Sequence, residues 1–89
     1  PAAYRAPAEP RNTWLALANE IDPDVARYFL VSARCGCFMQ AARSLNIQAT
    51  LLRKRLAQLE EHLRHSLFTY QGNGLVLSRD GLQLQAQLI

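Results

Sequence analysis

Three consecutive cations, Arg53, Lys54 and Arg55, are the residues of this chain whose type and spacing point most directly to a chemistry. Positively charged side chains in a row bind the phosphates of a polyanion, and such binding weakens steeply as the salt concentration rises. The alternative is a solvated basic face on a surface helix. The tripeptide alone leaves both interpretations open.

The charge of the whole chain is compatible with both interpretations and, on charge alone, gives them equal weight. The formal net charge of the 89 residues is +3, and it is distributed unevenly. Residues 1–24 contain two arginines and four acids, whereas residues 25–63 contain six cations and two acids. A basic middle region beside an acidic lead indicates either that the middle of the chain meets a polyanion or that it has a solvated basic face.

Other chemistries find little support in the sequence. Cys35, Cys37, His62 and His65 are zinc ligands by type, but their C-x-C and H-x-x-H spacings fall outside the usual windows, so we expect no metal site. A redox-sensing cysteine pair stays open, although a disulfide across one residue is strained and two reduced thiols fit a cytoplasmic protein. We find no catalytic constellation and no run of about 18 apolar residues, and so expect no enzyme, cofactor or membrane span.

Helical periodicity places Arg53 and Lys54 on one side of a helix predicted over residues 49–63, with Arg55 near the apolar edge. At 100° per residue, four leucines lie within about 40° of one direction and predict a buried stripe. Thr50, Arg53 and Lys54 lie on the opposite half, and the acids Glu60 and Glu61 follow nearer the C-terminal end. The stripe consists of Leu52, Leu56, Leu59 and Leu63.

Local signals predict the elements around this helix. Asn12 is expected to cap a first helix with one apolar face, and Asp22-Pro23 should start a second helix that ends at Gly36. A short Ala-rich helix over 38–45 and a brief turn at 46–47 precede the basic helix. The apolar face of the first helix contains Trp14, Leu17, Ala18 and Ile21.

Two short strands, 67–70 and 75–77, are predicted around the glycine-containing turn 71–74. Ser78 can cap a final helix from Arg79 onward. The segment LQLQAQL alternates with a strand period, but its composition and the cap favour helix.

These elements predict a mainly α fold with a small β-hairpin wing, a winged helix-turn-helix with a C-terminal linker helix and an extra N-terminal helix. Residues 1–11 are expected to be a flexible lead, 12–78 the domain, and 79–89 the truncated start of the linker helix.

The segment from Arg27 to Gly81 resembles the DNA-binding domain of LysR-type transcriptional regulators, a bacterial family, and the similarity extends over residues 26–89. Each matching residue is weak evidence alone, but together they are in register and without gaps. The matching residues are Arg27, Tyr28, Phe29, Gly36, Phe38, Ala41, Ala42, Leu45, Leu52, Leu56, Leu59, Glu60, Leu63, Leu67, Phe68, Leu77, Ser78 and Gly81.

The resemblance implies binding to double-stranded DNA as a homodimer, with the basic helix in the major groove and the wing on the flanking backbone. It also implies an effector domain after residue 89. The DNA-binding residues expected on this basis are Gln48, Ala49, Thr50, Arg53, Lys54, Arg43, Tyr70, Gln71 and Asn73. Those expected to dimerise are Leu82, Ala86 and Ile89.

Several residues depart from the family pattern. Gln48-Ala49-Thr50 replaces a common Ser-Gln-Pro, and Ala49 can offer only a methyl group to a base. Tyr70 stands where an arginine is usual, Arg64 where a glycine is usual, and Cys37 where a serine N-cap is usual.

These departures leave a second hypothesis, a degenerate helix-turn-helix that serves as a protein-interaction module. Leu51 and Tyr70 could then form an exposed apolar patch.

We also expect Glu60 to pair with Arg27 or Arg43.

Overall fold

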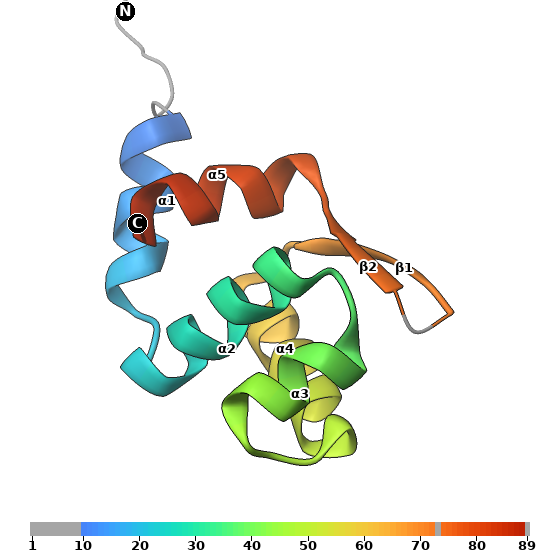
Figure 1. Ribbon diagram of the computed structural model, residues 1–89. Coiled ribbons are helices and arrows are strands. Elements are labelled where there is room, and N and C mark those ends of the chain that lie inside the picture. The colour runs from blue at the N-terminus through green and yellow to red at the C-terminus, as the bar shows by residue number, and fades with distance from the viewer. Residues whose placement is uncertain (1–9, 73, 89) are drawn as a thin grey trace, which may run out of the picture.

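The computed structural model describes residues 10–72 and 74–88, which form five helices and one hairpin (Figure 1). The order of elements agrees with the prediction from the sequence. The elements are α1 (Pro10–Asn19), α2 (Pro23–Cys35), α3 (Phe38–Leu45), α4 (Ala49–Leu63), β1 (Phe68–Gln71), β2 (Gly74–Leu77) and α5 (Arg79–Leu88).

The first helix begins earlier than the sequence suggested. α1 starts at Pro10, so Asn12 lies inside the helix and is not its N-cap. A proline is tolerated in the first turn because its missing N–H has no intrahelical acceptor there. Of the predicted flexible lead, residues 1–9 lie outside the described residues, while Pro10 and Arg11 belong to α1.

The helix ends of the central domain follow local rules at α2, with exceptions at α3 and α4. Asp22 accepts a hydrogen bond from the Asp24 amide at 3.0 Å and caps α2, which ends at left-handed Gly36. Cys37 precedes α3 without a side-chain capping bond. Arg64 ends α4 at φ 63°, so a residue with a Cβ adopts a conformation that favours glycine.

A single core joins α2, α3 and α4. Phe29, Leu52 and Leu56 are at most 1% exposed, and the small Ala41 and Ala42 are buried where α3 meets the other helices. The predicted leucine stripe is confirmed, because all four of its residues are buried. The basic side of α4 is thereby turned outward.

The hairpin projects from this core as the predicted wing (Figure 1). Its strands are antiparallel, with Phe68 opposite Leu77 and Gln71 opposite Gly74. The Leu75 amide donates to the Gly36 carbonyl at 3.0 Å, so the turn between α2 and α3 holds β2 in place. The wing is therefore attached to the helix-turn-helix by backbone hydrogen bonds as well as by its apolar face.

The extra helix α1 lies against α5, as Figure 1 shows. Trp14 is 5% exposed, and its ring centroid is 4.7 Å from that of His65, just beyond α4. Glu20 Oε1 is 3.6 Å from His62 Nε2. The predicted docking of the first helix through Trp14 is confirmed. No helix in the described part of the chain is long and apolar enough to cross a bilayer.

Candidate nucleic-acid interface

The N-terminal half of α4 presents its polar side to solvent. Gln48, Thr50, Arg53 and Lys54 are exposed and Ala49 is half-buried. Gln48 precedes the helix and makes no side-chain capping bond. Arg43, in the last turn of α3, is also exposed. This side of the helix pair carries cations without an acid until Glu60.

Arg53 lies over an aromatic ring of the core. Its Cζ atom is 4.3 Å from the centroid of Phe38, which is 2% exposed. A guanidinium over a ring face is attracted to the electron-rich π system. The contact places the guanidinium group itself against the Phe38 ring.

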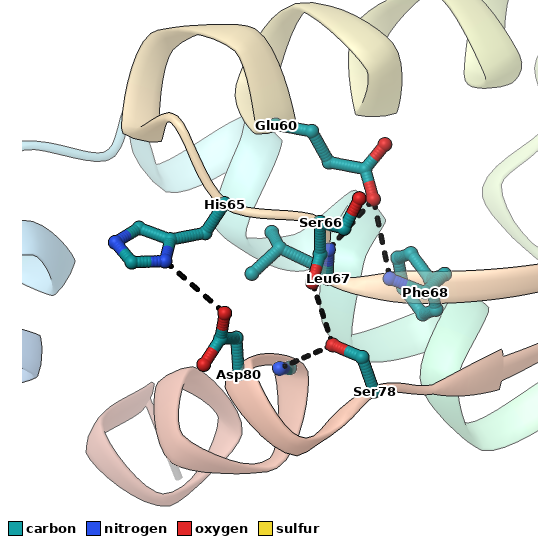
Figure 2. A network of polar contacts seen from close by, with 8 residues as sticks. Glu60, His65, Ser66, Leu67, Phe68, Ser78 and Asp80 are labelled. Atoms are coloured by element: carbon teal, nitrogen blue, oxygen red, sulfur yellow. Dashed lines mark hydrogen bonds and ion pairs between the residues drawn. The ribbon is translucent and has the colours of Figure 1, made fainter.

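Glu60 has partners that the sequence did not indicate, and its expected pairing with Arg27 or Arg43 is wrong. The amides of Leu67 and Phe68 donate to its Oε2 atom at 2.7 and 3.1 Å (Figure 2). The Tyr70 hydroxyl donates to Oε1 at 2.9 Å. Two amides at the start of the wing lie within reach of this carboxylate, so it is directed to the wing and not to a cation on α2 or α3.

Tyr70 joins the wing to both helices of the motif. Its ring stacks on Phe38 with centroids 5.7 Å apart and planes at 9°. Burial raises the pKa of the Tyr70 hydroxyl, and the hydrogen bond to Glu60 raises it further. Both effects favour the neutral hydroxyl, the form that donates the hydrogen bond to Glu60.

A shallow hollow of about 240 Å³ marks the junction of α3, α4 and the wing. Sequence reasoning missed this junction, because Phe38 and Tyr70 carry no periodic or spacing signal that pairs them. Its lining residues are Phe38, Arg53, Ala57, Glu60 and Tyr70.

The apolar patch suggested for an interaction module is not supported by the helix geometry. Tyr70 lies beside the face of α4 that carries Arg53, Ala57 and Glu60. Leu51 is about 160° around the helix from Arg53. Although Leu51 and Tyr70 are both exposed, at 36% and 43%, they lie on different flanks of α4.

Comparison with known proteins agrees with this arrangement. A family model described as a bacterial regulatory helix-turn-helix protein of the lysR family matches residues 24–82. The chain belongs to this family. The family resemblance and the winged helix-turn-helix fold predicted from the sequence are therefore confirmed. LysR-type domains of this kind bind DNA in transcriptional regulators.

Two solved structures are similar to this LysR-type domain. A transcriptional regulator of the LysR family from Eggerthella lenta DSM 2243 is 28% identical with a TM-score of 0.71, covering 76% of this chain and 97% of that chain. A probable transcriptional regulator from Pseudomonas aeruginosa is 26% identical with a TM-score of 0.72, covering 81% of this chain and 24% of that chain. The comparison with curated proteins gave no match.

The remaining predicted site residues of the LysR-type domain lie at the wing tip and on α5. Gln71 is exposed, whereas Asn73 lies outside the described residues. On α5, Leu82 is 54% exposed and Ala86 is exposed, while Ile89 lies outside the described residues. The structure therefore separates a basic surface on α4 from an apolar surface on α5.

Proposed function

We propose that this LysR-type domain binds duplex DNA by inserting the N-terminal part of α4 into the major groove. The observation that carries the proposal is the exposed surface formed by Thr50, Arg53 and Lys54 in the N-terminal half of α4, a half that contains no acidic residue. In a helix-turn-helix, the N-terminal residues of the second helix meet base edges. The Glu60 carboxylate accepts hydrogen bonds from wing amides, so its negative charge is directed to the wing and not to this basic surface.

The individual contacts are assigned by chemistry. Arg53 and Lys54 would bind guanine edges or phosphates, and Gln48 an adenine edge, while Ala49 would touch a thymine methyl group. Thr50 and Arg43 would contact the backbone beside the groove. The wing residues Gln71 and Asn73 would lie along the flanking backbone or minor groove.

Titration of duplex DNA at several salt concentrations tests the proposal. We expect the logarithm of the binding constant to fall linearly with the logarithm of salt concentration, with a slope of about −0.9 for each phosphate neutralised. A flat plot, or no binding at low salt, would contradict DNA binding through cations.

Arg55 provides a matched control on the same helix. It lies about 160° from Arg53 and lines a hollow with Glu20 and Asp22. Arg53→Ala should weaken binding about tenfold or more and change the sequences recovered from a random duplex pool. Arg55→Ala removes the same charge two residues away and should change affinity much less. Equal losses would remove Arg53 from the specific contacts.

We also propose that two copies pair through α5, using Leu82, Ala86 and Ile89. An apolar surface exposed on a terminal helix suits self-association. Leu82→Lys should weaken binding to a duplex with two half-sites and leave binding to one half-site unchanged. The same affinity for the two-site duplex would argue against this surface. The family further suggests a cytoplasmic regulator with an effector domain beyond residue 89.

A further inference from the structure

We infer that Tyr70 is a positioning residue for Arg53, which holds the guanidinium toward the groove by way of the Phe38 ring. The inference rests on the proposed function of α4 as the recognition helix. It differs from a direct contact between Tyr70 and DNA, because the effect of Tyr70 would pass through Arg53.

The first support is a continuous set of contacts. The Tyr70 ring lies nearly parallel to that of Phe38, at 9°, and Arg53 Cζ lies 4.3 Å from the centroid of the same ring. Phe38 is 2% exposed, and the Tyr70 ring is one of the groups packed on it, so Tyr70 helps to fix the position of the Phe38 ring. Tyr70 in the wing and Arg53 in the recognition helix are therefore connected through the orientation of the Phe38 ring, which both of them contact.

The second support is the charge around Arg53. Glu60 lines the same hollow and is the carboxylate nearest to this surface along α4. Tyr70 donates to one of its oxygens, and the amides of Leu67 and Phe68 donate to the other. Tyr70 thus completes a set of donors that directs the carboxylate to the wing.

The physical benefit is preorganisation. A solvated arginine side chain has about 2 kcal/mol of rotamer entropy, part of which is lost when it binds. A side chain already held over a ring loses less on binding, so affinity rises without an added contact. Removing the Tyr70 ring should loosen the Phe38 ring and thereby weaken one of the contacts that hold the Arg53 side chain.

A double-mutant cycle tests this connection. Duplex affinity is measured for the original chain, Tyr70→Leu, Arg53→Ala and the double variant. We expect Tyr70→Leu to weaken binding about tenfold alone and less than about twofold when Arg53 is already alanine. Equal losses in both backgrounds would show that Tyr70 acts independently of Arg53 and would overturn the inference.

Two further measurements separate positioning from a general loss of structure. Ring currents should displace the Arg53 side-chain proton resonances in the free protein, and Tyr70→Leu should move them toward random-coil values. Tyr70→Phe keeps the ring and should restore both the resonances and most of the affinity. Unchanged resonances in Tyr70→Leu, or a Phe variant as weak as the Leu variant, would refute the stack as the connection.

The same experiments distinguish failure of the inference from failure of the proposed function. If the original chain does not bind duplex at low salt, both fall. If it binds and the two substitutions act additively, only the role of Tyr70 falls.

Discussion

Gly81 offers a prediction in which two physical effects have opposite signs. It lies in the first turn of α5 and is buried. Alanine is a better helix former than glycine by up to about 1 kcal/mol, so propensity alone predicts that Gly81→Ala stabilises the protein. Packing predicts the reverse.

The packing cost follows from the close approach of α5 to the chain before β1. A Cβ atom on Gly81 would lie 2.1 Å from the Leu67 carbonyl oxygen and 2.8 Å from a Leu77 methyl carbon. Comfortable separations are about 3.5 Å or more, so α5 would have to retreat by more than about 1 Å.

That movement would strain bonds that join the same segments. The Ser78 amide donates to the Leu67 carbonyl at 2.9 Å. The Ser78 hydroxyl donates to the Ser66 carbonyl at 2.6 Å and accepts from the Gly81 amide at 3.0 Å, as drawn in Figure 2. Overpacking costs about 1–3 kcal/mol, and each weakened hydrogen bond costs about 0.5–1.5 kcal/mol. After the gain in propensity, we expect a net loss of about 2 kcal/mol.

Urea unfolding followed by circular dichroism measures this difference. A loss of about 2 kcal/mol should also lower the melting temperature by about 10 °C in a domain of this size. Ala86→Gly, at an exposed position of the same helix, is the control and should cost no more than about 1 kcal/mol. A Gly81→Ala variant as stable as the original chain would refute the packing argument.

Three further substitutions test other features. Arg64→Gly should raise the free energy of unfolding by about 1 kcal/mol, because glycine adopts φ 63° without a Cβ penalty; no gain in a urea titration would contradict this. Ser32→Ala should leave the free energy of unfolding unchanged or raise it by about 1 kcal/mol, since the Ser32 hydroxyl is buried and has no hydrogen-bond partner among the described residues. Ser44→Ala, at an exposed position, is the control, and a clear loss of stability at Ser32 alone would contradict the prediction. Trp14→Ala should cost about 3–5 kcal/mol and speed hydrogen exchange in α1 and α5; unchanged exchange would show that the two helices do not depend on this ring.

Local physics explains why much of the fold was predictable. The bounds of α3 and α4 agree with the predicted helices, because leucine periodicity and the flanking turns are properties of neighbouring residues. Asp22 and Gly36 act as the predicted caps for the same reason. The start of α1 was misplaced because Pro10 and Asn12 are both acceptable at a helix N-terminus, and nothing in the local sequence chooses between them.

The candidate site was predictable only in part. The outward direction of Arg53 and Lys54 follows from the angle of each residue around a helix whose opposite stripe is apolar. Their contacts with bases or phosphates remain predictions. Strand and turn signals predicted the wing, the resemblance to LysR-type regulators supplied the groove as an expectation, and the family match confirms the class of domain.

By itself, then, the sequence determined the order of the helices, the caps at Asp22 and Gly36, the buried leucine stripe and the side of α4 that carries Arg53 and Lys54. Only the tertiary structure decided which groups meet across the junction of α4 and the wing. Glu60 binds wing amides, Arg53 and Tyr70 both contact the Phe38 ring, and Gly81 leaves room for the Leu67 carbonyl. These contacts join residues of different elements, so they depend on the angles and distances between packed elements, which neither local propensity nor periodicity encodes.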